Sequence, residues 1–146
     1  MIRRLEHWSG ELYLHCSLRR GDPEEIIETS VPDTILQAVS REFADHRLAA
    51  SAAVRAIRAH EEGKNLARSL DLEFLLRLLG TRQISEAVKK AAPDRTFMAV
   101  VASRKKERVE EGVEKVEEAS EECLEEFPER DDFKRLLTRA ASVDAE

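Results

Sequence analysis

The sequence predicts a single α+β domain in which a small mixed or antiparallel sheet of about three to five strands packs against a helical bundle. Residues 11–18 alternate apolar and polar side chains, and residues 96–103 form one continuous apolar run. Between residues 45 and 91, three segments repeat apolar residues at helical spacing. The 146 residues are 42% hydrophobic, which is enough for one core and too little for two. We divide the domain into residues 1–40, 45–103 and 105–142.

The first forty residues predict a strand, a short helix and a second strand. The alternation over residues 11–18 is typical of a strand with one buried face. Asp22 can cap the helix, with Pro23 at its first position, and the helix ends before residue 31. Residues 34–39 are short and apolar and predict the second strand.

Two helices are predicted next. Asp45 can cap the first, which runs to about His60 and carries a stripe of small alanines that another helix can approach closely. Gly63 fits the left-handed turn that follows a helix. The second helix is expected to begin at Lys64 and Asn65, and its leucines leave only a narrow polar strip, so it should be mostly buried.

After a tight break at residues 80–81, the spacing predicts a third helix from residue 84 to Pro93. Residues 96–103 predict an interior strand. A long, glutamate-coated helix should run from about residue 105 to 127, with the apolar seam Val109, Val113, Val116, Cys123, Leu124 and Phe127. A final amphipathic turn is expected at residues 133–140.

Charge is distributed unevenly along the chain. The net charge is -6, but residues 1–40 carry -3, residues 41–106 carry +6 and residues 107–146 carry -9. Charges further apart than about 8 Å are largely screened at physiological salt, so a basic middle segment can form a local polyanion site within an acidic protein. The alternative is a solubilising surface with no such role.

Several function classes have little support in the sequence. No apolar run is long enough to span a bilayer, and the first residues lack the pattern of a signal peptide, so we expect a soluble intracellular protein. Cys16 and Cys123 are read as reduced core residues, because they lack metal-site spacing. The four histidines show no spacing of a metal or acid–base site, and Gly63-Lys64-Asn65 lacks the residues of a phosphate-binding loop. We therefore expect no enzyme activity, no metal and no cofactor.

Polar residues gather at the starts of the second and third predicted helices. Lys64, Asn65 and Arg68 lie at one start, and Arg82 and Gln83 lie at the other. Helix N-termini present free N–H groups and a positive dipole end, which suit phosphates or base edges. The simpler interpretation is structural: Asn65 caps its helix, Glu73 pairs with Arg77 four residues later, and Arg82 is solvated.

Residues 45–101 resemble the small regulatory subunit of KEOPS, the complex that makes threonylcarbamoyl-adenosine in tRNA; this is the PRPK-binding protein family. In that family an alanine-rich helix leads to G-x-N-x-A-R-x-L-x-x-E-x-L-L, then a glycine, R-Q-I, an alanine and a valine-rich strand. The matching residues here are Gly63, Asn65, Ala67, Arg68, Leu70, Glu73, Leu75, Leu76, Gly80, Arg82, Gln83, Ile84, Ala87, Val100 and Val101. The close match covers a little over a third of the chain.

The resemblance implies a non-catalytic, cytoplasmic subunit that binds the atypical kinase/ATPase subunit of KEOPS and the 3′ CCA end of tRNA, with no membrane and no small-molecule substrate. Phosphates of a single-stranded end would contact Lys64, Arg68 and Arg82, near Asn65 and Gln83, and a base would stack on Ile84. Residues 75–92 contain no aromatic side chain, so binding should depend on charge and be sensitive to salt.

Two other functions fit parts of the sequence. The break at residues 80–81, followed by Arg82, Gln83 and two lysines, resembles a helix-turn-helix DNA-binding regulator. Against it, the preceding helix is unusually long and apolar, and an apolar strand follows at once. The third possibility is a pure protein-interaction scaffold, with the helix from Val109 to Phe127 as its docking face.

Overall fold

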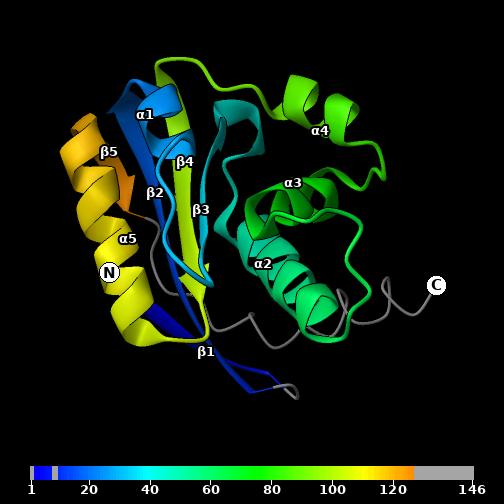
Figure 1. The fold of residues 1–146 in the computed structure, drawn as a ribbon. Coiled ribbons are helices and arrows are strands. Elements are labelled where there is room, and N and C mark those ends of the chain that lie inside the picture. The colour runs from blue at the N-terminus through cyan, green and yellow to red at the C-terminus, as the bar shows by residue number, and fades with distance from the viewer. Residues whose placement is uncertain (1, 8–9, 127–146) are drawn as a thin grey trace.

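An antiparallel sheet runs through the middle of the molecule, with helices on both of its faces (Figure 1). The computed structural model describes residues 2–7 and 10–126. Within these residues the strands are β1 (Arg3–His7), β2 (Gly10–Gly21), β3 (Ile35–Ser40), β4 (Thr96–Ser103) and β5 (Ser120–Glu126). The helices are α1 (Pro23–Ile27), α2 (His46–Glu61), α3 (Leu70–Leu79), α4 (Ile84–Ala91) and α5 (Lys106–Ala119), with a 3-10 turn at Arg41–Phe43. The predicted α+β class and the antiparallel alternative for the sheet are confirmed.

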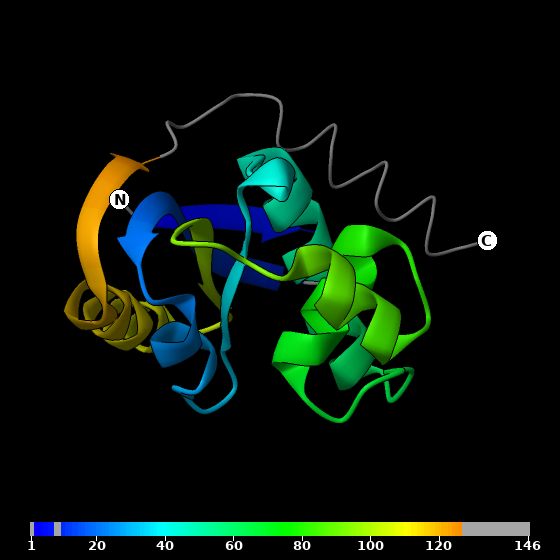
Figure 2. The same ribbon diagram turned by 90° about the horizontal axis from the view of Figure 1, so that it is seen from above.

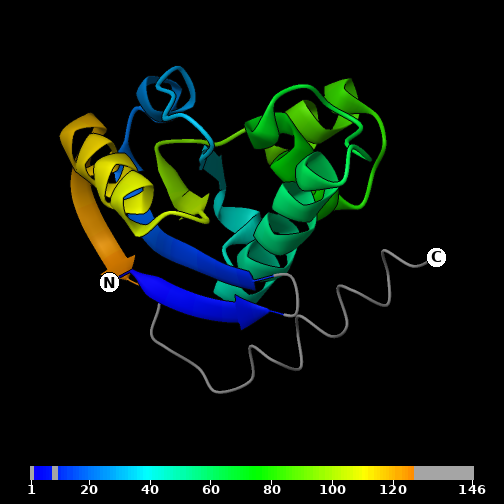
Figure 3. The ribbon, with the colours of Figure 1, turned by 60° about the horizontal axis from the view of Figure 1, so that its bottom comes forward.

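The strand order is β1-β2-β4-β3, and β5 also pairs with β2. β4 lies between β2 and β3, so the predicted interior strand is confirmed. β2 is long enough to pair with two strands in succession: β1 lies along its first half and β5 along its second (Figure 3). We did not expect β1 or β5 from the sequence.

The pleat divides the core between two helical layers (Figure 2). Alternate residues of β2 and β4, such as Leu14, Cys16 and Val100, pack under α2, α3 and α4. The residues between them in β4, Phe97 among them, pack under α1 and α5. Successive residues of a strand point to opposite faces of the sheet, so the alternation that predicted the first strand also determines which helices its side chains contact.

The alanine-rich helix α2 forms as predicted. Asp45 caps it, because its Oδ1 accepts a hydrogen bond from the Arg47 N–H at 2.8 Å. The alanines are buried, and their small side chains let α3 pack closely with Phe74, Leu75 and Leu76 also buried. The prediction of a central α2 and a mostly buried α3 is therefore confirmed.

The predicted start of the second central helix is wrong. α3 begins at Leu70 rather than at Lys64, and its cap is Ser69, whose Oγ accepts from the Leu72 N–H at 3.3 Å. Residues 62–69 form a loop without regular structure. The helix-favouring side chains of this segment are overruled by hydrogen bonds to a buried carboxylate, described below.

The predicted helix from 105 to 127 is also partly wrong. α5 ends at Ala119, and the glutamate-rich segment that follows is β5, which pairs with the open edge of β2. Cys123 is exposed on this strand, so only Cys16 is the core cysteine that we predicted. The propensity of glutamate for helices is weaker than the gain from pairing an open strand edge.

The remaining C-terminal predictions lie outside the described residues. Phe127 and the amphipathic turn at residues 133–140 belong to this part of the chain. Within the described residues, none of the helices has both the length and the apolar character needed to cross a membrane.

Candidate nucleic-acid interface

The loop at residues 62–69, which we call the motif loop, begins with a left-handed turn. Gly63 has φ 70°, a conformation that glycine adopts without the strain of a Cβ atom. The Lys64 N–H donates to the carbonyl of Ala59 at 2.8 Å, and the Gly63 N–H donates to that of His60 at 3.3 Å. These two bonds terminate α2 in a Schellman arrangement, as the position of Gly63 predicted.

Glu73 of α3 anchors the middle of the motif loop. Its side chain is 0% exposed, and its Oε1 accepts from the N–H groups of Leu66 at 2.6 Å and Ala67 at 2.8 Å. Its Oε2 accepts from Nε of Arg77 at 2.9 Å, so the predicted i+4 pair is confirmed. Asn65 does not cap a helix; its Nδ2 donates to the carbonyl of Ala67 at 2.9 Å.

On one side of the motif loop lies a groove of about 410 Å³, which we call the basic groove. It is bounded by the end of α2, the motif loop, the end of α3 and the turn before α4. Its lining residues are Arg55, Arg58, Ala59, Glu62, Lys64, Leu66, Leu76, Arg77, Gly80, Thr81 and Arg82. Five of these side chains are cationic and one is acidic.

Two carboxylates of the described residues pair with three of these cations. Glu62 accepts from Arg58 at 3.2 Å and lies 3.8 Å from Nζ of Lys64, and Glu73 holds Arg77. Within residues 2–7 and 10–126, no carboxylate lies within ion-pair distance of Arg82, which is exposed. The described lining of the groove therefore holds more cations than acids, an arrangement that suits a polyanion.

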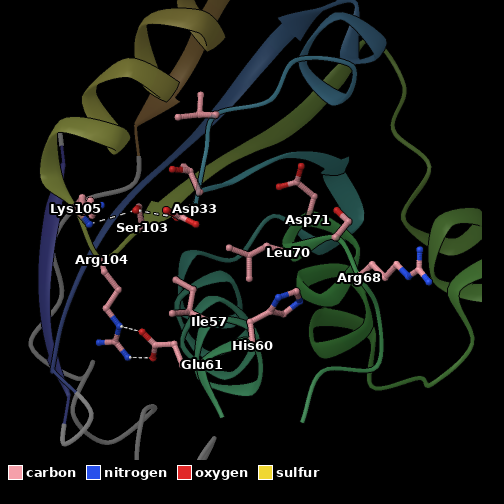
Figure 4. Close-up of a pocket in the computed structure, with 13 residues that line it drawn as sticks. Asp33, Ile57, His60, Glu61, Arg68, Leu70, Asp71, Ser103, Arg104 and Lys105 are labelled. Carbon is pink, nitrogen blue, oxygen red and sulfur yellow. Dashed lines mark hydrogen bonds and ion pairs between the residues drawn. The ribbon is translucent and has the colours of Figure 1, made fainter. Parts of the chain in front are cut away.

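On the other side of the motif loop lies a larger cavity of about 670 Å³, which we call the mixed cavity (Figure 4). Its charged and titratable lining residues are Asp33, His60, Glu61, Arg68, Asp71, Arg104 and Lys105. Arg104 makes a bidentate ion pair with Glu61: its Nη2 donates to Oε1 at 2.7 Å and its Nε donates to Oε2 at 2.9 Å. Figure 4 shows the guanidinium of Arg68 directed away from the centre of the cavity. Acids and bases are balanced here, in contrast to the basic groove.

Asp71 is the titratable group of the mixed cavity with the most perturbed pKa. Burial raises the pKa of its carboxyl from 3.8 to about 6, although the Leu36 N–H, which donates to Oδ1 at 2.7 Å, favours the ionised form. Nε2 of His60 is buried 4.0 Å from Oε1 of Glu73, and it has no hydrogen-bond partner among the described residues. Among the described residues, Nε2 of His60 is thus a buried polar atom of this cavity that lacks a hydrogen bond.

The structure brings together some of the predicted site residues and separates others. Lys64 and Arg82 line the same groove, whereas Arg68 lies on the other side of the motif loop. Gln83 is the N-cap residue of α4, without a side-chain cap bond, and Ile84 follows with 40% of its surface exposed. One of the two expected helix starts exists, at α4.

The predicted helix start at Lys64 and Asn65 is therefore wrong. The polar residues at 64–68 lie on a loop, and two of the loop's N–H groups, those of Leu66 and Ala67, already donate to Glu73. Backbone N–H groups that are satisfied by a carboxylate cannot bind a phosphate. Any anion binding here depends on side chains instead.

Sequence reasoning missed Arg55, Arg58 and Arg77 as groove residues. The first two lie three residues apart on α2, away from the alanine stripe, so a plot of that helix would have placed them on one polar face. Arg77 was noted only as a partner of Glu73. Its contribution to the groove depends on how α3 packs on α2, which spacing within one helix does not reveal.

No protein-family model matches this chain, and the comparison with curated proteins found none similar to it. Among the described residues, no group of three or more His, Cys, Asp or Glu side chains could hold a metal ion.

Proposed function

We propose that this chain is a non-catalytic, cytoplasmic accessory subunit of the KEOPS tRNA-modification complex, which binds the kinase/ATPase subunit and the 3′ CCA end of tRNA. The proposal is supported by where the residues of the family motif lie in the fold. The residues of the family motif, from Gly63 to Ile84, run through the motif loop, α3 and the turn into α4, and the motif loop, the end of α3 and this turn are walls of the basic groove. The stretch that carries the resemblance thus also carries the excess of positive charge.

The groove suits a single-stranded ribose-phosphate chain. Its volume is about 410 Å³, and its cations come from four segments, so successive phosphates could each meet a different side chain. The guanidinium of Arg82 can donate two hydrogen bonds to one phosphate without first breaking an ion pair to a described residue.

Apolar side chains at the edge of the groove offer surfaces for bases. Leu66 is 48% exposed and lines the groove, and Ile84, 40% exposed, starts α4 two residues after Arg82. Aliphatic side chains bind a base face less strongly than aromatic ones, for which about 1–3 kcal/mol per base is typical. Affinity should therefore come mainly from phosphates, as the sequence predicted.

A mobility-shift titration with three nucleic acids tests this function. We expect full-length tRNA with an intact CCA end to bind more tightly than the same tRNA with those three nucleotides removed, and both to bind more tightly than duplex DNA. Co-purification with the KEOPS kinase subunit tests the second half of the proposal. Equal affinity for the intact and the shortened tRNA would contradict recognition of the 3′ end.

The two alternatives give different results in the same titration. A helix-turn-helix regulator would bind a DNA palindrome more tightly than any tRNA. A pure scaffold would bind the kinase subunit and neither nucleic acid. The helix that we predicted as the docking face of a scaffold ends at Ala119, and Val109 and Val116 of its apolar seam are buried against the sheet, so a partner would meet the polar side of α5.

A further inference from the structure

Glu73 is a buried carboxylate in a segment that otherwise presents positive charge. Burying a carboxylate is unfavourable unless its oxygens accept hydrogen bonds, and Glu73 accepts three, at 2.6, 2.8 and 2.9 Å. Two of the donors are the N–H groups of Leu66 and Ala67, seven and six residues earlier in the chain. This carboxylate therefore fixes the conformation of a loop that lies outside its own helix.

The loop that Glu73 fixes is the partition between the two hollows. Lys64 and Leu66 face the basic groove, whereas Arg68 and Ser69 line the mixed cavity. Ala67, between them, is buried, so the loop is held at its middle by one apolar side chain and one carboxylate. The same carboxylate also holds Arg77, another cation of the basic groove.

We propose that Glu73 is a positioning residue for RNA binding: it orders the motif loop in the unbound protein so that Lys64, Leu66 and Arg77 already face the groove. This inference rests on the proposed function. Ordering a loop before binding raises affinity, because the cost in conformational entropy does not fall on the binding step. Glu73 itself is fully buried and need not touch the ligand.

The sign of the effect distinguishes positioning from simple charge. Glu73 is an acid close to a polyanion site, so on electrostatic grounds alone its neutralisation in Glu73→Gln should strengthen RNA binding. If Glu73 positions the loop, the same substitution should weaken binding. A neutral acceptor forms hydrogen bonds about half as strong as a carboxylate does, so we expect a loss of about tenfold in affinity.

The test combines amide hydrogen exchange with titration of an RNA oligonucleotide that ends in CCA, each on the full chain. In Glu73→Gln, the amides of Leu66 and Ala67 should exchange about tenfold faster or more, while amides of β4 keep their relative protection. Affinity should fall by a similar factor, with an unchanged salt dependence because no phosphate contact is removed.

Two further variants keep the test decisive. Glu73→Asp retains the charge but is one methylene shorter, so it should lose loop protection and affinity like Glu73→Gln. Leu75→Ala, on the same helix and buried in the core but without a hydrogen bond to the loop backbone, should lower stability but keep the affinity of the folded protein.

Binding by Glu73→Gln that is as tight as or tighter than that of the wild type would overturn the positioning role, and so would unchanged protection of Leu66 and Ala67. A wild-type protein that does not bind the oligonucleotide would instead overturn the proposed function. In that case the exchange rates still decide whether Glu73 holds the loop.

Discussion

The two hollows beside the motif loop are built from similar residue types but differ in charge balance. The basic groove has five cations and one acid in its lining, and Arg82 has no carboxylate partner within the described ranges. The mixed cavity is larger, but its three acids oppose its three arginine and lysine side chains, and Arg104 is already paired with Glu61. Size alone would favour the cavity as a binding site, whereas the excess of positive charge favours the groove for a polyanion.

The largest expected effect is a loss of tRNA affinity when two cations of the basic groove are replaced by acids. The double substitution Lys64→Glu and Arg82→Glu should lower tRNA affinity by about a hundredfold, because two charge-assisted contacts to phosphate become repulsive. Both residues are exposed, so the free energy of unfolding should change by less than about 0.5 kcal/mol. A titration of tRNA together with a denaturant melt measures both quantities.

The matched control for that variant is Lys105→Glu, which reverses one charge on the mixed cavity. We expect its tRNA affinity to stay within about threefold of the wild type, since exposed charges at a distance are screened. A larger loss of tRNA affinity in Lys105→Glu than in the groove variant would indicate that the RNA binds at the mixed cavity rather than in the basic groove.

Salt provides the next largest effect. If two or three phosphates are bound in the groove, raising salt from 50 to 200 mM should weaken binding of the wild-type protein by about tenfold. The Lys64→Glu, Arg82→Glu variant should show a shallower dependence, because it releases fewer counterions. Parallel salt dependences for the two proteins would indicate that the phosphates are bound elsewhere.

The success and failure of the sequence predictions follow from where each hydrogen bond is made. The cap of α2, the ends of β4 and the start of α4 depend on neighbours in the chain or on a strongly apolar pattern, and they were predicted within about two residues. The motif loop and β5 were not predicted, because their backbone groups bond to Glu73 and to β2 rather than to near neighbours. Spacing within one segment does not reveal such partners.

In the candidate site, too, the sequence predicted the residues that depend on local signals and missed those that depend on packing. Lys64 and Arg82 were predicted and line one groove, because each lies beside a turn that glycine marks in the sequence. Arg68 was grouped with them on the assumption of a helix that does not form there. The groove's other arginines required the packing of α3 on α2 to be known.

The smallest predicted effect concerns Asp71 and tests the mixed cavity. Burial raises the pKa of Asp71 to about 6 in the folded protein, so the folded state binds a proton more tightly than the unfolded chain does. The resulting stabilisation is fully present below pH 3.8 and is lost as pH rises through 6.

Relative to Asp71→Asn, the wild-type protein should therefore gain about 1 kcal/mol in free energy of unfolding as pH falls from 7 to 5. Denaturant melts of both proteins at the two pH values measure this difference. A difference that does not change with pH would show that the carboxyl is not perturbed. The tRNA affinity of Asp71→Asn at pH 7 should equal that of the wild type, because we propose that RNA binds in the basic groove and not in the mixed cavity.

The most direct test is to map where a short RNA ending in CCA contacts the protein, by following backbone amide chemical shifts during a titration. We predict that the largest changes fall in residues 62–69 and 80–84, on the side of Lys64 and Arg82, with little change at Asp33 and Lys105. Changes concentrated at Asp33, Ser103 and Lys105, with residues 80–84 unaffected, would place the RNA in the mixed cavity and contradict the assignment of the basic groove.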